Sequence, residues 1–583
     1  MMVSTEKKNS YKEKIATITD WHSIDWKRAE RQVRILQKKI SDAYEQKAYR
    51  AAKRLQYVLS NSFYAKALAV RQVTGNKGKN TAGTDGKVWS TPKLKMEAAS
   101  TLNQGRYTAK PLRRIYIPKS SGKDQLRPLS IPTMYDRAMQ RLYAYGFEPI
   151  SELHADGFSY GFRKYRSTQD AVKRIHNTLS KKWSPQWVID ADIKGCFDNI
   201  HHQWIIENVP IQKTVLQQWL KCGYIDQKQL FPTEQGVPQG GIISPMITNF
   251  VLDGMLDYVR KQLKLDKYGT YTKASLYNAQ GENIRPYAVR TKSAKVNMIR
   301  YADDFICTVA HQEEIPFVLK AIRQYLGQRG LELHPEKTQI RTINEGFDFL
   351  GWNIRQYNGK LLIKPSRKSI QKIKKKIKEV FKEHVAQKQE NLIYELNLVL
   401  RGWGNYFRTH VSSRVFTDID SYIWQRTQKW IKRRHPKKRM DWGNDKYFCT
   451  IGKDRWVFGT EKGYLMKLQK VKIRRHHLIA EELNYFKNPE KFEAYIATRK
   501  LASKLDNPKL YHLYHREQGI CPYCLSKIED HLFDVHHIVK RKEQGGNKWD
   551  NLVMLHRNCH RTMHAKKEKL VRLPNEQWKV QEE

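Results

Sequence analysis

Two adjacent carboxylates interrupt an apolar stretch near the middle of the chain. The tetrapeptide Tyr301-Ala302-Asp303-Asp304 follows the run MIR and precedes the run FICTV, which is typical of a hairpin turn between two buried strands. Two neighbouring carboxylates at such a turn repel each other, and this arrangement is costly unless a cation lies between them. Because an isolated tetrapeptide of this kind is usually only an acidic loop, its meaning depends on the segments around it.

A third carboxylate follows another apolar strand. That strand begins at Trp187 and ends in Asp192, which we expect to be a further metal ligand. Carboxylate oxygens suit Mg²⁺, and nucleotidyl transfer uses two such ions to activate a primer 3′-OH and stabilise the leaving pyrophosphate. Between the two segments lies GVPQGGIISPMITNF (236–250), a Gly-rich turn that enters a helix. Its Gln239-Gly240 pair can lie against a nascent base pair, because glycine lets the backbone approach closely.

The charge balance indicates a nucleic-acid partner. Lys and Arg number 107 against 58 Asp and Glu, which gives a formal net charge of +49 over 583 residues. Such an excess repels itself in a compact body unless a polyanion neutralises it, and neutralisation of phosphates drives nucleic-acid binding. The alternative is a ribosomal-type or merely soluble basic protein. The aromatic content of 11% with 15 Trp argues against that alternative, since stacking on bases needs such rings.

Cysteine usage and the N-terminal segment indicate a reducing compartment. The seven Cys are odd in number and only the last three have metal-ligand spacing, which is not a disulfide framework. Residues 1–14 lack the apolar region of a signal peptide and are expected to be disordered. No uncharged apolar run approaches the roughly 18 residues of a membrane span. We therefore expect a protein of the bacterial cytoplasm or nucleoid, or of an organelle equivalent, with no membrane partner.

Hydrophobic periodicity predicts a multidomain α+β chain. Helical spacing begins at Asp25 and continues to Val73, and a Gly-, Lys- and Asn-rich loop covers 75–87. Residues 110–355 alternate short β-branched runs with helical stretches, which is an α+β pattern. A three-helix unit is predicted over 366–435, and its first helix is strongly basic.

The order of the motifs resembles a known family. RPLSIP, SYGFR, ADIKGCFDNI, GVPQGGIISP, YADD, HPEKT and FDFLGW are similar to the successive reverse transcriptase motifs of group II intron-encoded proteins, over nearly the whole chain. The resemblance implies a right-hand polymerase with fingers, palm and helical thumb. It also implies that Asp192, Asp303 and Asp304 are the catalytic residues that bind two Mg²⁺ ions.

The same resemblance implies a site for the incoming dNTP. Phe197 would stack on the sugar and exclude a 2′-OH, and Gln239 would contact the nascent pair. Lys119 and Arg127 would grip the triphosphate as charge-assisted donors. Lys337, in HPEKT, is a candidate proton donor to pyrophosphate, and a plain surface lysine is the alternative.

The segment that follows the last polymerase motif resembles the maturase-specific X domain, which is the thumb in polymerase terms. The resemblance lies in RGWGNYFR (401–408), and the basic faces of these helices would track duplex and intron RNA backbone. The basic helix has too many Lys and Arg for i,i+4 pairing to explain. Trp403, Tyr406 and Phe407 are either base-stacking groups or core, and their helical spacing favours core.

A cluster of thiols and one imidazole near the C-terminus predicts a structural zinc site. Cys521-Pro-Tyr-Cys524 has the spacing of a zinc knuckle, and His556-Arg-Asn-Cys559 repeats the two-residue gap. Three soft thiolates and an imidazole suit tetrahedral zinc. The alternative is two unrelated Cys residues and a surface His.

The segment VHHIVKRKEQGGNKWDNLVML lies between these two pairs and resembles the HNH ββα-metal nuclease. The resemblance implies that His536, His560 and His564 hold one divalent metal, with the last two on one helix face at i,i+4. It implies that His537 is the general base for the attacking water and that Asn551 orients this base by a hydrogen bond. Many relatives have Cys at the position of the single zinc-site His, which leaves the fourth zinc ligand open.

Together these resemblances imply an intron-mobility protein with group II intron RNA, target DNA and dNTPs as partners. It would assist splicing, nick target DNA and extend the freed 3′-OH on intron RNA. One rival is an RNA chaperone with a decayed polymerase, against which the three intact Asp argue. Another is a retron, CRISPR-linked or diversity-generating reverse transcriptase, against which the maturase-like segment joined to HNH argues. The predicted domains are the N-terminal extension and first fingers segment (1–109), fingers and palm (110–358), thumb or X domain (359–439), DNA-binding region (440–505) and zinc-stapled HNH domain (506–583).

Overall fold

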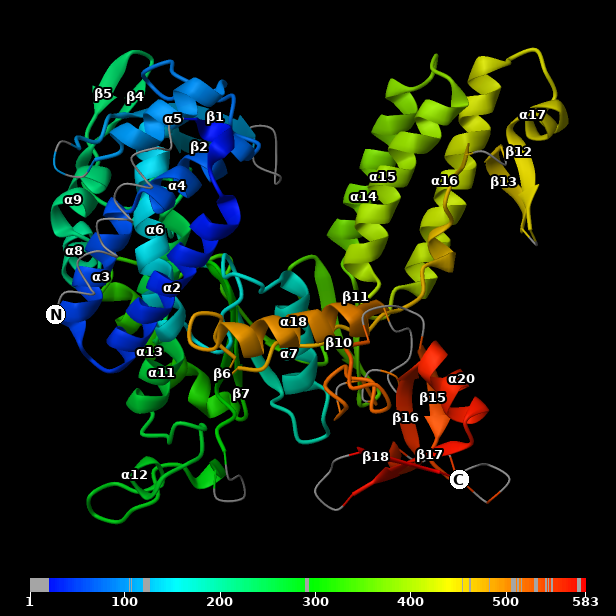
Figure 1. Ribbon diagram of the computed structural model, residues 1–583. Helices are drawn as coiled ribbons and strands as arrows, with labels where there is room; N and C mark the ends of the chain where they lie inside the picture. The colour runs from blue at the N-terminus through cyan, green and yellow to red at the C-terminus, as the bar shows by residue number, and fades with distance from the viewer. Residues whose placement is uncertain are drawn as a thin grey trace, which may run out of the picture. The chain divides into compact units, whose positions relative to one another are not determined.

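The computed structural model describes residues 20–582 apart from short gaps, and the chain forms two compact units (Figure 1). The first unit is Met1–Ser369 with Leu478–Lys487, and the second is Ile370–His477 with Asn488–Glu583. The disorder predicted for residues 1–14 lies outside the described residues. The gaps are residues 104, 106, 119–125, 289–292, 453, 461–462, 482, 505–509, 511–512, 515, 529–532, 540–542, 544, 547–548 and 574–577, and the side chains of 498 and 500–504 are also not described.

The N-terminal part of the first unit is helical, as the periodicity predicts. Its helices are α2 (Trp26–Glu45), α3 (Tyr49–Asn61), α4 (Phe63–Gly75) and α5 (Pro92–Thr101), preceded by the short η1 (Trp21–Ser23). The side chain of Asp25 caps α2 by accepting a hydrogen bond from the Arg28 N–H at 3.0 Å. Ala29, Val33 and Ile40 are buried at the predicted spacing. Of these, α2, α3 and α4 pack on the long α6 (Met134–His154), which is buried on nearly all sides, and α5 packs on α4.

A four-stranded antiparallel sheet forms the centre of this unit. Its strands are β3 (Trp187–Ala191), β6 (Asn297–Tyr301), β7 (Asp304–Val309) and β8 (Gln339–Thr342), in the order β6-β7-β3-β8. The apolar runs noted in the sequence supply its core, since Ile189, Phe305 and Cys307 are completely buried. Three helices complete this core: α10 (Ser244–Leu252), α11 (Met255–Gln262) and α13 (Ile315–Gly327).

Two further sheets accompany the central one, and the strands of the first lie before and after β3 in sequence. The first joins β1 (Leu112–Pro118), β2 (Leu126–Ile131), β4 (Tyr224–Asp226) and β5 (Gln229–Phe231) in the order β2-β1-β4-β5, with β1 and β4 parallel. The second joins β9 (Phe347–Phe349), β10 (Trp352–Tyr357) and β11 (Lys360–Pro365). The remaining elements of this unit are α7 (Thr168–Leu179), α8 (His202–Asn208), α9 (Lys213–Lys221), α12 (Lys273–Leu276), η2 (Pro286–Ala288) and η3 (Gln312–Glu314).

The predicted three-helix unit is present in the second compact unit. Its helices are α14 (Arg367–Glu383), α15 (Gln389–Phe407) and α16 (Ser413–Arg434), which lie side by side in Figure 1. Phe407 is buried and contacts the half-buried Trp403 and Tyr406, so the core interpretation of these rings is confirmed for Phe407 and partly for the other two. After the bundle come α17 (Met440–Tyr447), η4 (Leu468–Lys470) and a small sheet of β12 (Phe448–Ile451), β13 (Asp454–Thr460) and β14 (Gly463–Tyr464).

The C-terminal part contains a ββα arrangement. Strands β15 (Phe533–His537) and β16 (Leu552–His556) pair antiparallel, and α20 (Arg557–Ala565) packs beside them. Its hydrophobic core is small and includes Cys521, Val553 and Met563. The other elements are α18 (Pro489–Lys504), η6 (Trp549–Asn551), β17 (Glu568–Arg572) and β18 (Trp578–Glu582).

Two further findings concern the chain as a whole. The segment Leu478–Lys487 of the predicted DNA-binding region belongs to the first compact unit, whereas the residues on either side of it belong to the second. Within the described part of the chain, every helix is too short or too polar to cross a membrane.

Candidate active sites

Three carboxylates meet at one end of the central sheet. Tyr301 and Asp304 pair across β6 and β7, so Ala302 and Asp303 form a two-residue turn, with Ala302 at φ +60°. Asp192 follows β3 directly, and the pairing of Ala191 with Phe305 places it next to Asp304. The hairpin predicted from the apolar flanks is therefore present, and a strand more than a hundred residues away brings the third carboxylate to it.

The electrostatics of this cluster favour a bound cation. Desolvation and the nearby Asp192 raise the pKa of Asp303, against the opposing charges of Arg127 and Lys337. Desolvation, followed by the carboxylates of Asp303, Asp192 and Asp190, raises the pKa of Asp304 to about 6. Each carboxylate thus disfavours ionisation of its neighbours, and hard divalent cations relieve that repulsion.

Among the described residues, the groups whose ligand atoms all lie within 4.8 Å of one another are the two Cys/His clusters, and the three aspartates do not form such a group. Lys337 donates a hydrogen bond from Nζ to Asp192 Oδ2 at 2.6 Å, so it lies beside the site rather than on a remote surface.

A cleft of about 350 Å³ is lined by the expected dNTP-site residues Phe197 and Gln239, together with Asp198, whereas Asp192, Asp303 and Asp304 are not among its lining residues. Gln239 Nε2 donates to both carboxylate oxygens of Asp198, at 3.0 and 2.9 Å, which fixes the direction of its amide. Arg127 lies exposed on β2, and its charge acts on Asp303. Lys119 lies outside the described residues.

Glycine at the predicted Gly-rich turn is required by close backbone contacts. A Cβ on Gly240, which has φ +121°, would lie 2.6 Å from the Ser130 carbonyl oxygen. The Ser130 N–H donates to the Gln239 carbonyl at 2.7 Å, so β2 and this turn are joined at that point. The turn is therefore held against β2, the strand that carries Arg127.

In the ββα arrangement, three imidazoles converge. His536 Nδ1 lies 3.2 Å and His564 Nε2 lies 3.1 Å from His560 Nε2. His560 Nδ1 lies 3.2 Å from Asp534 Oδ2. Donation to this carboxylate leaves a lone pair on His560 Nε2. Ligand nitrogens around one tetrahedral ion at about 2.0–2.1 Å stand about 3.3 Å apart, so the donor set fits one divalent metal.

His537 and Asn551 lie where the ββα resemblance expects them, with one difference. His537 ends β15 and pairs with Leu552. Asn551 Oδ1 accepts from the Val539 N–H at 2.6 Å, and Nδ2 donates to the carbonyls of Val539 and Gly546 at 3.0 and 2.9 Å. The structure therefore directs the Asn551 amide to the loop after His537, so that it would orient the base through the backbone instead of bonding the ring.

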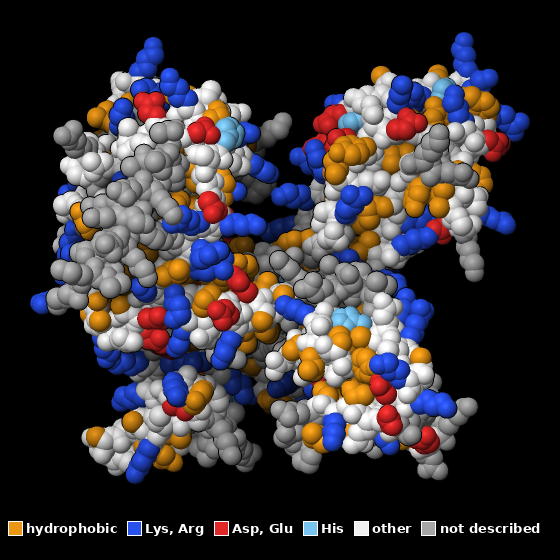
Figure 2. All heavy atoms as spheres, viewed as in Figure 1, with side chains coloured by type: hydrophobic (Ala, Val, Ile, Leu, Met, Phe, Trp, Pro, Cys, Tyr) orange, Lys and Arg blue, Asp and Glu red, His pale blue; other side chains and the backbone are white. Residues whose placement is uncertain are grey.

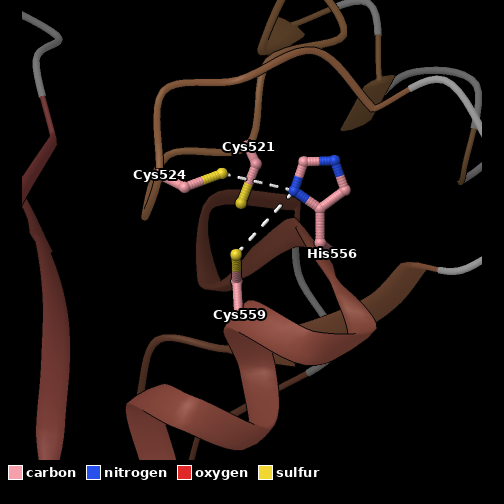
Figure 3. Close-up of side chains that lie close together, drawn as sticks. All are labelled: Cys521, Cys524, His556 and Cys559. Carbon is pink, nitrogen blue, oxygen red and sulfur yellow. Dashed lines mark hydrogen bonds between the residues drawn. The ribbon is translucent and has the colours of Figure 1, made fainter.

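The predicted zinc ligands Cys521, Cys524, His556 and Cys559 come together (Figure 3). His556 Nδ1 lies 3.3 Å from Cys524 Sγ and 3.8 Å from Cys559 Sγ. His556 Nε2 lies 3.2 Å from the Lys527 carbonyl, to which it can donate, which leaves Nδ1 as the ligand atom. This geometry is compatible with His556 as the fourth ligand of a zinc site. Although desolvation opposes ionisation, hydrogen bonds from the Ser526 backbone and the other ligands lower the pKa of Cys524 to about 7, and the metal-binding form is the thiolate.

Basic side chains are distributed over the whole visible face, among polar and apolar atoms and several acidic patches (Figure 2). On α14 the stripe of Ile373, Ile377 and Val380 is buried. Lys375 and Lys376 are exposed on the same helix, while Lys374 is half-buried with its ammonium over the Tyr422 ring at 5.3 Å. Two faces of one helix therefore serve two purposes, core packing and the display of charge.

Sequence reasoning missed two residues of the polymerase cluster. Asp190 lies on β3 two residues before Asp192, and desolvation followed by Asp348 and Asp192 raises its pKa to about 6, against Arg341. The period of two along a strand could have placed both carboxylates on one face. Asp198 holds Gln239, and this long-range contact leaves no periodic signal in the sequence.

Comparisons with known families agree with this arrangement along most of the chain. The model described as reverse transcriptase (RNA-dependent DNA polymerase) matches residues 117–354, and that of the N-terminal domain of reverse transcriptase matches 21–102. The group II intron maturase-specific domain matches residues 370–448. The HNH endonuclease model matches residues 521–566, which hold both Cys/His clusters.

Similar proteins include two from bacteria. Protein YkfC of Escherichia coli is 34% identical over 303 residues, which are 49% of this chain and 78% of that protein. Group II intron-encoded protein LtrA of Lactococcus lactis is 31% identical over 343 residues, which are 51% of this chain and 56% of that protein, so the chain spans just over half of its length. A solved telomerase of Candida albicans aligns over 58% of this chain and 61% of its own, with 12% identity and a TM-score of 0.31.

Proposed function

The chain belongs to the group II intron-encoded reverse transcriptases and maturases that carry an HNH endonuclease domain, and we propose that it copies its own intron into nicked target DNA. The HNH domain would cut one strand of the target, and the polymerase would extend the freed 3′-OH with dNTPs on intron RNA. The observation that supports this most strongly is that one chain joins a three-carboxylate palm cluster to a three-imidazole nuclease cluster.

At the polymerase site, Asp192, Asp303 and Asp304 would hold two Mg²⁺ ions. Bound there, the ions supply the positive charge that lowers the pKa of the primer 3′-OH and stabilises the leaving pyrophosphate. Phe197 would lie against the sugar and exclude a 2′-OH, and Arg127 would bind the triphosphate. Lys337, already within 2.6 Å of Asp192, would be close enough to donate a proton toward pyrophosphate.

At the nuclease site, His536, His560 and His564 would hold one divalent ion that stabilises charge on the scissile phosphate. His537, at the end of the same strand, would take the proton from the attacking water. Asn551 would keep the loop after this base in place through its three backbone hydrogen bonds. The four-ligand zinc cluster would hold the ββα fold together and take no part in the chemistry.

Splicing assistance would depend on the basic helical bundle. α14 exposes Lys375 and Lys376, which can neutralise RNA phosphates.

Two assays on the purified protein–intron RNA particle test this function together. Strand-specific cleavage of end-labelled target DNA should require His537, and extension of a pre-nicked target should require Asp303. If His537→Ala extends the pre-nicked target but cannot use intact target, the two activities act in the proposed order. If His537→Ala inserted the intron into intact target at the normal rate, the nicking role would be contradicted. If the flanking DNA encoded no intron ribozyme, one of the other reverse transcriptase classes would be favoured.

A further inference from the structure

A buried arginine lies directly beneath the carboxylate turn. Arg300 is the last residue before Tyr301, is 1% exposed and is among the largest fully buried side chains. Its Nη2 forms an ion pair with Asp253, whose side chain is equally buried. A buried ion pair is a weak source of net stability, because desolvation offsets most of its attraction. We therefore expect it to fix local geometry at this point rather than to add stability.

The guanidinium of Arg300 reaches the turn itself. Its Nη1 donates to the carbonyl oxygen of Ala302 at 3.2 Å and to Asn249 Oδ1 at 3.1 Å. Ala302 is the residue at φ +60°, a conformation that residues other than glycine rarely adopt. The hydrogen bond therefore fixes the peptide group that precedes Asp303 and sets the direction in which the two carboxylates leave the sheet.

A second chain segment contacts the same turn one peptide earlier, at the Tyr301–Ala302 peptide group. Asn249, on α10, donates from Nδ2 to the Gly161 carbonyl at 2.7 Å. A Cβ on Gly161 would lie 2.3 Å from the Ala302 nitrogen, so only glycine allows this contact. The segment is also paired to β6, since the Tyr160 N–H donates to the Arg300 carbonyl and the Arg300 N–H to the Phe158 carbonyl, both at 2.9 Å.

We propose that Arg300 and Asn249 are positioning residues that lock the Ala302 turn so that Asp303 and Asp304 face a shared divalent-metal site. This inference rests on the proposed polymerase site. It explains why SYGFR contains glycine and why the helix after the Gly-rich turn carries a buried asparagine, two features that contact with nucleotide does not require. Side chains that orient metal ligands typically change metal affinity about 10–100-fold when they are replaced.

The test compares two buried arginines. Arg300 lies in β6 next to the turn, whereas Arg260, on α11, forms hydrogen bonds with the backbone at the other end of β6. Arg260 is 8% exposed and donates to the Val296 carbonyl at 3.0 and 3.2 Å and to the Lys267 carbonyl at 2.6 Å, far along the strand from the turn. Arg300→Lys and Arg260→Lys each remove one planar fork and keep the charge. Asn249→Ala is the companion variant, because it breaks the link to Gly161 while leaving the Arg300–Asp253 pair intact.

Metal occupancy is measured on the full chain by Fe²⁺-dependent hydroxyl-radical cleavage of the backbone, which maps each site by the position of the cut. Arg300→Lys and Asn249→Ala should need about 10-fold or more Fe²⁺ for half-maximal cutting beside Asp303. Their half-saturating Mg²⁺ for primer extension should rise in parallel. Cutting beside His560 should be unchanged, and Arg260→Lys should match the unsubstituted protein at both sites.

Each outcome decides a different question. Unchanged palm occupancy in Arg300→Lys, or an equal loss in Arg260→Lys, would overturn the positioning role. If Arg300→Lys does not fold, as judged by limited proteolysis, Asn249→Ala decides, and wild-type occupancy in it rejects the inference. Asp303→Asn distinguishes failure of the proposed polymerase site from failure of the positioning role. If this variant still shows Fe²⁺-dependent cutting beside the palm and still extends primers, the metal site itself is refuted. If Asp303→Asn loses both while Arg300→Lys keeps both at normal levels, only the positioning role is refuted.

Discussion

The palm cluster and the C-terminal Cys/His clusters are built in opposite ways. The palm carboxylates come from strands more than a hundred residues apart and rest on a sheet whose residues Ile189, Phe305 and Cys307 are completely buried. The ligands of the two C-terminal clusters all fall within residues 521–564, around a small hydrophobic core. We expect the palm to fold without its metal ions, because burial of apolar surface already stabilises the strands that carry the carboxylates.

At the C-terminus we expect the fold to depend on the metal. A small core contributes little stability to a short domain, and structural zinc contributes about 10–16 kcal/mol in small zinc domains. On this hypothesis, the palm metal site is a product of its fold, whereas the C-terminal zinc site is a cause of its fold. The size of the hydrophobic core that supports the ligands, large in the palm and small at the C-terminus, distinguishes the two kinds of metal site.

Loss of a zinc ligand should have the largest effect. Cys521→Ser removes a completely buried thiol, so the C-terminal domain should unfold locally and DNA cleavage should vanish together with one equivalent of zinc. Atomic absorption and target-DNA cleavage measure both. Cys449→Ser, at a half-buried thiol outside the cluster, should keep zinc and cleavage. Full zinc content in Cys521→Ser would contradict the claim that this cluster holds the zinc on which the C-terminal domain depends.

Neutralising a palm carboxylate should abolish chemistry without disturbing the fold. Asp303→Asn should lower primer extension about 10³-fold or more, because a metal supplies several kcal/mol of transition-state stabilisation. Intron RNA binding and thermal stability should stay near normal. Asp257→Asn, at an exposed acid on α11, is the control and should extend primers normally. Normal extension by Asp303→Asn would reject the site assignment.

Removal of the proposed base should affect chemistry alone. His537→Ala should lower target-DNA cleavage about 10²–10⁴-fold, the usual worth of a general base, while zinc content is retained. Zinc lost from His537→Ala but kept by Cys521→Ser would show that the two C-terminal clusters have exchanged roles. Extension on pre-nicked DNA should be normal in both variants.

The smallest effect is expected on the basic helix of the bundle. Changing Lys374, Lys375 and Lys376 to Gln should flatten the log–log salt dependence of intron RNA binding by about 2 units. The expected change in slope is smaller than the loss of three full phosphate contacts would give. The reason is that the Lys374 ammonium lies over the Tyr422 ring, so Lys374 contributes less to phosphate binding. The triple change to Arg keeps the charge and should keep the slope. An unaltered slope with Gln would mean that this helix makes no phosphate contacts.

Local patterns predicted the elements and most ligands, and long-range contacts account for the rest. The spacing of Ala29, Val33 and Ile40 predicted α2, because these residues repeat at the helical period, and the repeated two-residue gap in Cys521/Cys524 and His556/Cys559 predicted the zinc cluster. Contacts such as Asn249 with Gly161 join segments without any shared periodicity. The docking of Leu478–Lys487 on the first unit and the direction of the Asn551 amide were missed for the same reason.

Amide hydrogen exchange on the full chain, before and after zinc is removed by a chelator in the presence of Mg²⁺, tests the contrast most directly. Opening of a domain whose fold depends on metal exposes its amides, whereas a sheet fixed by apolar burial keeps them protected. The expected result is loss of protection in β15, β16 and α20, with β3, β6 and β7 unchanged. Continued protection of β15 and β16 without zinc, or loss of protection in β6 and β7, would contradict the account.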